Sequence, residues 1–197
     1  TAEDILESGA RNIILATGAT WRRDGVGRTL WKPIAGHELE NVFSPDDLMD
    51  GEKVIGKLVN GNWVIYDDDH YYMGGVLAEL LAEQGCRVSL VTPAPLVSYW
   101  SQFTLEQERI QAKLMKLGVT LHVQTVMSGI GGDFVKLSNT ISGEEVELPR
   151  NGVVLVSDRI SNDSLFYAIK PALDEGKINS LRVIGDAEAP NIIAQAV

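Results

Sequence analysis

Residues 63–91 read WVIYDDDHYYMGGVLAELLAEQGCRVSLV and decide the fold of this chain. A strand is expected at Trp63–Tyr66, because its residues are hydrophobic without alternation, as in a parallel sheet buried on both faces. Gly85 would end the helix that follows, and Arg87–Val91 forms a second strand. Apolar residues of that helix recur at helical spacing, at Met73, Leu77, Leu80 and Leu81. These elements make one strand–helix–strand unit of about 30 residues, the building block of a Rossmann-like α/β fold.

Two further strand ends lie on either side of this unit. The first reads Ile14-Leu15-Ala16-Thr17-Gly18-Ala19, and the second reads Val183-Ile184-Gly185-Asp186-Ala187. Small residues at the carboxyl end of a parallel strand let a ligand approach the backbone, and open α/β sheets bind ligands there. Either motif alone is common in α/β proteins, but their order and spacing strengthen the signal. The cofactor-binding candidates are therefore Thr17, Gly18, Gly185, Asp186 and Ala187. The Asp186 carboxylate can accept hydrogen bonds from ligand hydroxyls or hold a loop that faces phosphate.

The chain before the strand–helix–strand unit begins with a predicted helix and strand. The helix covers Ala2–Ser8 and is closed by Gly9, and the strand covers Asn12–Ala16. Trp21–Asp50 has the glycines and prolines of a loop, with a helix start at Ser44, the expected N-cap before Pro45.

After the unit, the pattern predicts a helix in which Thr104 and Gln107 match the capping-box spacing and which Gly118 ends. Three or four short strands are expected between Val119 and Val156. The last stretch should contain, in chain order, a helix at Ser164–Leu173, a strand at Leu181–Ile184 and a helix from Pro190 onward. Because the chain stops inside the apolar run IIAQAV, we expect it to be a piece of a longer protein.

Composition and charge exclude several classes of function. The chain has 27 acidic and 17 basic residues, a formal net charge of −10, and no basic stripe of the kind that binds nucleic acid. Its longest apolar runs, such as Val153–Val156, are far shorter than a membrane span. The single cysteine, Cys86, excludes an internal disulfide, a CxxC redox pair and a cysteine-rich metal site. We expect a cytoplasmic protein whose acidity serves solubility or presents an acidic face to a protein partner.

The first turn of the strand–helix–strand unit lacks the glycines that a dinucleotide needs. A working site would carry G-x-G-x-x-G, whereas Asp67, Asp68, Asp69 and His70 stand here. The carboxylates would repel a phosphate where backbone N–H groups should bind it. The sequence thus predicts a Rossmann frame that binds no NAD(P). Two other roles for the turn stay open. We favour a carboxylate cap on the following helix over a metal site, because adjacent residues rarely converge on one ion.

Three segments resemble a known family. They are Asp67–Leu81, the FTLE run at Phe103–Glu106 and the GDAEAP run at Gly185–Pro190. Together they resemble the C-terminal nucleotide-binding region of the trimethylamine dehydrogenase, dimethylamine dehydrogenase and 2,4-dienoyl-CoA reductase family of NADH:flavin oxidoreductases. The resemblance spans almost the whole chain. Trimethylamine dehydrogenase-like relatives also lack the glycines in this turn, which favours that branch over the reductases.

The resemblance implies two dinucleotide-type domains. Residues 51–156 would form a Rossmann-like three-layer sandwich, an NAD(P)-binding-like domain with a degenerate nucleotide loop. It would be inserted into a partial FAD/ADP-binding-type domain at residues 1–50 and 157–197. By resemblance, Thr17-Gly18 and Gly185-Asp186 line an adenine-nucleotide site for ADP or FAD, which should bind weakly because its phosphate loop would lie upstream of Thr1. FMN and a 4Fe-4S cluster belong to the missing N-terminal part.

The expected function is that of a fragment of a flavin-dependent oxidoreductase whose parent oxidatively demethylates a small amine. We expect the fragment to be structural or nucleotide-binding, without catalytic residues of its own, since His37, His70 and His122 are scattered. Relatives show Thr-Gly-Arg where this chain has Ser157-Asp158-Arg159, and the lost glycine weakens the case for a ligand there.

Two alternatives stay open for the function. In the first, the chain is part of an NADPH-dependent 2,4-dienoyl-CoA reductase-like enzyme. In the second, it is an interaction module that docks an electron-transfer partner. A docking surface for such a partner could include the aromatic residues Tyr71, Tyr72, Tyr99 and Trp100. Aromatic side chains of this kind more often belong to the core. The expected partners are the rest of the parent chain, an electron-transfer flavoprotein and a second copy in a homodimer through an exposed sheet edge. Neither nucleic acid nor a membrane is expected.

Overall fold

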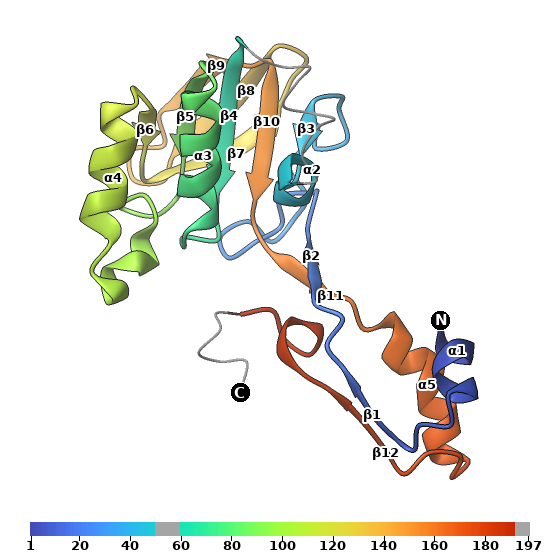
Figure 1. Cartoon of the computed structure of the whole chain (residues 1–197). Helices are drawn as coiled ribbons and strands as arrows, with labels where there is room; N and C mark the ends of the chain where they lie inside the picture. Colours follow the sequence, from blue (N-terminus) through green and yellow to red (C-terminus); the bar gives the residue numbers. More distant parts are fainter. Residues whose placement is uncertain (50–59, 192–197) are drawn as a thin grey trace. The chain divides into compact units, whose positions relative to one another are not determined.

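The structure is a computed structural model, and it describes residues 1–49 and 60–191. Internal contacts divide the chain into two compact units. The central unit comprises Trp21–Asp158, and the flanking unit comprises Thr1–Thr20 together with Arg159–Val197. Both units combine helices with strands, so the predicted α/β class is confirmed (Figure 1).

A parallel sheet forms the middle of the central unit. Its strands are β3 (Val42–Phe43), β4 (Asn62–Asp67), β5 (Arg87–Val91), β6 (Thr120–His122) and β10 (Gly152–Val156). Their order is β3-β10-β4-β5-β6, and each neighbouring pair is parallel. The register sets Val64 of β4 opposite Val153 on one side and Ser89 on the other. All carboxyl ends therefore meet at one edge of this sheet.

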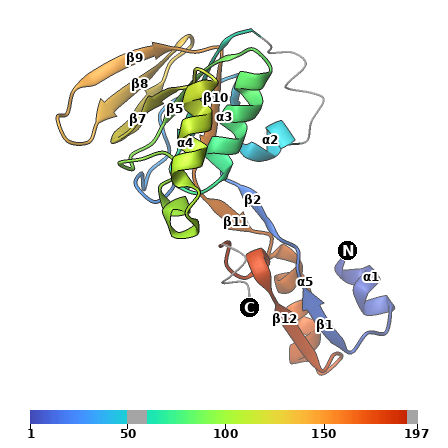
Figure 2. The ribbon, with the colours of Figure 1, turned by 60° about the vertical axis from the view of Figure 1, so that its left-hand side comes forward.

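Helices cover one face of the parallel sheet and an antiparallel sheet covers the other (Figures 1 and 2). The helices are α3 (Met73–Glu83) and α4 (Gln107–Lys116), and the antiparallel strands are β7 (Thr125–Ile130), β8 (Phe134–Asn139) and β9 (Glu145–Pro149). Along β4, Trp63 and Ile65 pack toward the helices, whereas Val64 and Tyr66 pack toward the antiparallel sheet. Because side chains alternate across a strand, one strand supplies two cores, and the central unit has three layers.

The strand–helix–strand unit forms close to its predicted bounds. The strand predicted at Trp63–Tyr66 gains one residue at each end, the helix begins at Met73, and β5 matches its prediction. Between Val119 and Val156 lie the five strands β6 to β10, more than the predicted three or four. The reason is that β6 and β10 complete the parallel sheet while β7, β8 and β9 form a sheet of their own.

The predicted capping box at Thr104 is wrong. Tyr99–Thr104 forms the 3₁₀ helix η2, and Leu105 takes a left-handed φ of 60° that separates it from α4. The Thr104 hydroxyl donates to the Ser101 carbonyl at 3.0 Å instead of capping α4, which begins at Gln107. Helical spacing alone did not reveal this break.

The predicted loop at Trp21–Asp50 contains short regular elements. Helix α2 (Pro45–Met49) begins at Pro45 as expected, and both the backbone N–H and the hydroxyl of Ser44 donate to the Asp47 carboxylate. This is the reciprocal half of a capping box. Strand β3 was missed because two residues are too short to show a pattern.

The flanking unit contains a two-stranded parallel sheet. Strands β1 (Asn12–Leu15) and β12 (Ser180–Val183) pair with Leu15 opposite Val183. Helices α1 (Ala2–Glu7) and α5 (Ser164–Asp174) pack in one apolar cluster with Ile13 and Leu15. Ile14 lies on the other face and is 64% exposed. A second pair joins β2 (Ala19–Trp21) to β11 (Arg159–Ser161).

The unit boundaries differ from the predicted domain boundaries at residues 50/51 and 156/157. Contacts separate the units after Thr20 and after Asp158. Residues 21–49 belong to the central unit because β3 joins its sheet and α2 contacts β10. The boundary predicted at residue 50, and most of the helix predicted from Pro190, lie outside the described residues. Among the helices that the structure describes, none has the length and apolar character to cross a bilayer.

Candidate functional site

The two predicted strand-end motifs lie at the same edge of the flanking unit. Because β1 and β12 are parallel neighbours, Thr17-Gly18 and Gly185-Asp186 follow adjacent strand ends, and the Ile184 N–H donates to the Leu15 carbonyl at 2.9 Å. Gly18 has φ 71° and Gly185 has φ 63°, a region that favours glycine. A Cβ built at either glycine meets no atom of the described residues within 4 Å. The backbone of both turns is therefore open to an approaching group.

Asn162 and Ser161 tie the two motifs together. The Thr17 hydroxyl donates to the Asn162 carbonyl at 2.5 Å, and the Asn162 backbone N–H donates to the Gly18 carbonyl at 2.9 Å. On the other side, the Ser161 hydroxyl donates to the Asp186 carbonyl at 2.9 Å. The end of β11 thus bridges both predicted turns. Neither residue was predicted as part of the site, since neither lies in a strand-end motif.

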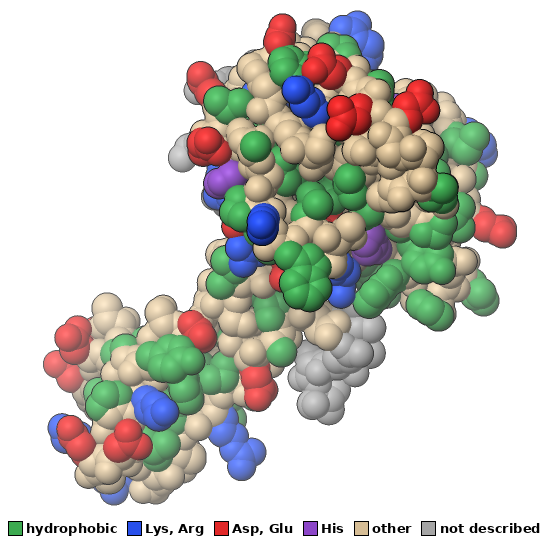
Figure 3. Space-filling view, turned by 180° about the vertical axis from the view of Figure 1, so that it is seen from behind, with side chains coloured by type: hydrophobic (Ala, Val, Ile, Leu, Met, Phe, Trp, Pro, Cys, Tyr) green, Lys and Arg blue, Asp and Glu red, His purple; other side chains and the backbone are tan. Residues whose placement is uncertain are grey.

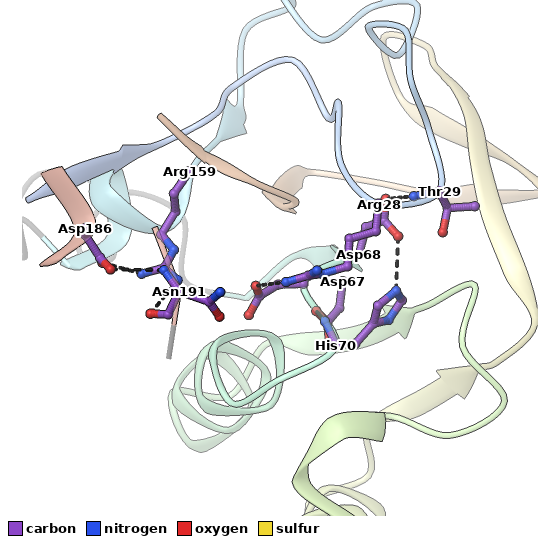
Figure 4. A network of polar contacts seen from close by, with 9 residues as sticks. Arg28, Thr29, Asp67, Asp68, His70, Arg159, Asp186 and Asn191 are labelled. Carbon is purple, nitrogen blue, oxygen red and sulfur yellow. Dashed lines mark hydrogen bonds and ion pairs between the residues drawn. The ribbon is translucent and has the colours of Figure 1, made fainter. Parts of the chain in front are cut away.

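Asp186 holds a loop. Its Oδ2 accepts from Nη1 of Arg159 at 2.6 Å, and its Oδ1 accepts from the Asn191 backbone N–H at 3.1 Å (Figure 4). Arg159 also donates to the Asn191 carbonyl at 3.2 Å. These contacts show that Asp186 fixes the segment from residue 186 to 191. From the sequence, Arg159 was named only because it follows Asp158, which stands where relatives have a glycine.

A pocket of about 610 Å³ lies open to solvent in the flanking unit. Residues of β12 and α5 line it, together with Ala187, which is 2% exposed. Of the five predicted cofactor-binding residues, only Ala187 lines this cavity. The other four form the strand-end edge described above, so the predicted set divides between two neighbouring surfaces of this unit.

The acidic turn of the central unit directs its carboxylates to opposite faces. Asp67 points toward α3, where a Cβ built at Gly74 would lie 2.5 Å from the Asp67 Cγ. Asp68 points toward the loop containing Gly27, where a Cβ would lie 2.6 Å from the Asp68 Oδ2. Both aspartates are fully buried. The first turn of α3, where a dinucleotide phosphate would approach in a working Rossmann site, is thus in contact with the Asp67 side chain.

Burial dominates the electrostatics of Asp67. It raises the pKa of this carboxyl to about 7, against a smaller opposing effect of His70. Oδ1 accepts from the His70 backbone N–H at 3.0 Å, whereas Oδ2 is buried without a hydrogen-bond partner in the part of the chain that the structure describes. Helix α3 begins after Tyr72 with no side-chain cap, so the predicted carboxylate cap is wrong. The carboxylate bonds within its own turn instead.

Asp68 connects the turn to a loop and to a histidine. Its Oδ2 accepts from the Thr29 N–H at 2.8 Å, and its Oδ1 lies 3.2 Å from Nε2 of His70 (Figure 4). The other ring nitrogen of His70 lies 3.3 Å from the Thr92 hydroxyl. The line Thr92–His70–Asp68 has the order of a nucleophile, a base and an acid. Thr92 and Asp68 are 0% exposed, so the arrangement offers a substrate no access and reads as a structural network.

The divergence of Asp67 and Asp68 also argues against a metal ion at this turn. Ligands must converge on one point, whereas these carboxylates face different elements. Across residues 1–49 and 60–191, no three His, Cys, Asp or Glu side chains gather closely enough to hold an ion.

The four aromatic residues near the turn are half-buried. Arg28 lies over the Trp100 ring at 4.4 Å from its centroid, and its Nη2 lies 3.9 Å from Asp69. The Tyr72 hydroxyl donates to Glu106, which raises the pKa of Tyr72 to about 12. These side chains hold loops together at the carboxyl edge of the parallel sheet. On the face in Figure 3, acidic side chains are dispersed among basic ones instead of forming one acidic patch.

Comparisons with known proteins agree on one group of enzymes. The family model described as the OYE-like second alpha/beta domain matches residues 43–164. Dimethylamine dehydrogenase of Hyphomicrobium sp. (strain x) is 35% identical over 100% of this chain and 29% of its own length. Among solved structures, 6-hydroxypseudooxynicotine amine oxidase of Pseudomonas geniculata N1 matches with a TM-score of 0.93 and 38% identity, over 99% of this chain and 29% of that one. Histamine dehydrogenase of Rhizobium sp. 4-9 gives the same score and identity, over 100% and 30%. The chain therefore spans less than a third of these relatives.

Proposed function

This chain belongs to the OYE-like second alpha/beta domain family, within the trimethylamine dehydrogenase-like group, and on that premise we propose that it is the nucleotide-domain region of a flavin-dependent amine oxidoreductase. In this proposal the parent oxidises a small amine, as the names of the relatives suggest. The region itself carries no reaction centre. It supplies a structural central unit and part of an adenine-nucleotide site in the flanking unit.

The contact between Asp67 and Gly74 carries the proposal. A dinucleotide needs the first turn of the helix after the first strand to stay free for its phosphates. Here a buried carboxylate occupies that position, and a second one, Asp68, faces the loop beside it. An approaching pyrophosphate would meet steric exclusion and like charge together. The central unit is thus a Rossmann-like domain that kept its fold after losing its ligand, inserted between the two segments of a partial FAD- or ADP-type domain.

The residues of the flanking unit fit part of an adenine nucleotide. Gly18 and Gly185 expose backbone at neighbouring strand ends, and Asp186 orders the loop that follows. With Thr17 and Ala187 they would form one wall of a site for ADP or FAD. The cradle for the phosphates is not among the described residues of this unit, so affinity in the chain alone should be low. When bound, such a group would serve as a structural nucleotide or as a flavin that accepts electrons.

A 4Fe-4S cluster does not fit these residues. A 4Fe-4S cluster takes four cysteine thiolates, and the sequence has Cys86 alone. In the proposal, FMN and the cluster are held by the remainder of the parent. The relatives are more than three times as long as this chain.

Thermal unfolding with added nucleotides tests the proposal. The purified chain is heated with millimolar ADP, FAD, NADH or NADPH, each added separately. A ligand at 100 times its dissociation constant stabilises by about 2.7 kcal/mol, which visibly raises the midpoint. We expect no rise with NADH or NADPH and a small rise with ADP or FAD. A clear rise with NADH or NADPH would contradict the proposal that the central unit binds no NAD(P). It would favour the 2,4-dienoyl-CoA reductase alternative.

Two glycine variants locate the adenine site. Gly18 and Gly176 share φ 71°, and a Cβ at either meets no atom within 4 Å. Gly18→Ala and Gly176→Ala should therefore lose similar stability, about 1 kcal/mol each. Only Gly18→Ala should also lose the response to ADP or FAD. Equal responses in both variants would remove Gly18 from the proposed site.

A further inference from the structure

Loop 24–34 of the central unit is fastened to the acidic turn 67–70. The Asp68 carboxylate accepts from the backbone N–H groups of Thr29 at 2.8 Å and Leu30 at 3.5 Å. Asp69 lies 3.9 Å from the Arg28 guanidinium, which also stacks on Trp100. The loop approaches this closely because Gly27 has no side chain that would strike Asp68. Two adjacent carboxylates thus hold one loop.

The turn itself is held in an unfavourable backbone conformation. His70 has φ 65°, a conformation that residues other than glycine adopt only at a cost in free energy. Three contacts keep it there: its N–H bonds to Asp67, its ring lies beside Asp68, and its carbonyl accepts from the Trp100 N–H at 2.9 Å. When these contacts weaken, the turn can relax toward water and take the anchor of the loop with it.

We propose that turn 67–70 is a pH-sensitive latch, which holds loop 24–34 closed while Asp67 is protonated and releases it when Asp67 ionises. Ionised Asp67 would place a third adjacent negative charge beside Asp68 and Asp69, in a fully buried position with Oδ2 unpaired among the described residues. Moving the turn into water relieves this repulsion. The latch goes beyond the proposed function, because it needs no nucleotide and no parent chain.

The surroundings of Asp67 favour its neutral form near neutrality. The titratable and charged groups facing it are His70, Asp68 and Asp69 of its own turn and Tyr66 beside it on β4. Loop 24–34 contributes Arg28, which is directed at Asp69. The first turn of α3 contributes no charge, since it consists of Met73, Gly74 and Gly75. Burial outweighs the favourable effect of His70, and the pKa of Asp67 rises to about 7.

Hydrogen exchange at the Thr29 amide tests the latch. Protection factors are measured for the whole chain from pH 5 to 8 and corrected for the intrinsic exchange rate. Because opening releases one proton from Asp67, Thr29 protection should fall about tenfold per pH unit between about pH 5 and 6.5 and level off above about pH 7. The Val153 amide, which donates to Asn41 within the parallel-sheet core, should keep its protection over the same range.

Two variants separate the latch from general loosening. Asp67→Asn keeps the size of the side chain but cannot ionise, so its Thr29 profile should be flat. Asp69→Asn removes the partner of Arg28 and leaves Asp67, so it should keep the slope. A flat wild-type profile, a slope that survives in Asp67→Asn, or parallel loss at Thr29 and Val153 would each overturn the latch. Should Asp67→Asn not fold, the wild-type comparison of Thr29 with Val153 decides alone.

Discussion

The turn after β1 in the flanking unit and the turn after β4 in the central unit occupy the same place in their sheets. Each follows the carboxyl end of a parallel strand, where α/β proteins bind ligands. At Gly18 the backbone is open, and a Cβ would touch nothing within 4 Å. After β4 the carboxylates of Asp67 and Asp68 are buried against Gly74 and Gly27. The comparison teaches that two similar strand ends can differ in a few side chains, which leave the backbone open at one turn and fill the space beside the next helix at the other.

Gly74→Ala should produce the largest effect, because it tests how tightly the closed turn is packed. Its Cβ would lie 2.5 Å from the Asp67 Cγ and 2.8 Å from the Asp67 Cβ, so the start of α3 must move. We expect a loss of about 2–3 kcal/mol in the free energy of unfolding, measured by urea denaturation.

Gly75→Ala is the matched control for Gly74→Ala. Its nearest neighbours would be the Ser98 hydroxyl at 3.1 Å and the Ile110 Cγ2 at 3.2 Å, so a smaller loss is expected. In an Asp67→Ala background, Gly74→Ala should cost less than in the wild type, because the contacts with the Asp67 Cγ and Oδ2 are removed and only the contact with the Cβ remains. Additive losses in the double variant would show that Asp67 does not fill the turn, and the contrast with the open turn at Gly18 would fail.

Asp67→Asn should show how much the buried Asp67 carboxyl lowers the free energy of unfolding when it ionises. The folded pKa of about 7 lies above the ordinary value of 3.8, so the folded protein binds more protons than the unfolded chain between these pH values. The free energy of unfolding of the wild type should therefore fall as pH rises from about 4 to about 7. At pH 8 the variant should be more stable than the wild type, and at pH 4 the advantage should vanish. Urea denaturation at pH 4 to 8 measures both curves, and parallel curves would contradict the prediction.

Arg159→Ala should produce a smaller effect, in the open turn of the flanking unit. The pair of Arg159 with Asp186 is partly exposed, so we expect a loss of about 1 kcal/mol in stability. Exchange of the Asn191 amide should accelerate, because Asp186 would no longer be held beside it. The exposed Arg182 of β12 provides the control, since Arg182→Ala should leave the Asn191 amide unchanged. Equal acceleration in both variants would show that Arg159 does not order this loop.

Much of the fold was predictable from local sequence. The strand–helix–strand unit at Trp63–Val91 appeared near its expected bounds because apolar spacing and Gly85 report local geometry. The family also followed from local segments, such as the GDAEAP run. The break at Leu105 escaped prediction, since helical spacing continues through it while the backbone turns left-handed. The assignment of residues 21–49 to the central unit escaped as well, because strand β3 is too short to signal its pairing with β10.

The sequence by itself determined the α/β class, the family, and the presence of carboxylates where a dinucleotide site would need glycines. These properties depend on residue type and spacing along the chain, which the sequence records directly. Only the tertiary structure decided that Asp67 and Asp68 diverge, that Asp68 holds a loop from 39 residues earlier, and that Arg159 engages Asp186. Such contacts join residues far apart in the chain. They arise from the packing of strands and loops at one sheet edge, where burial, and not sequence neighbourhood, sets the partner of each charge.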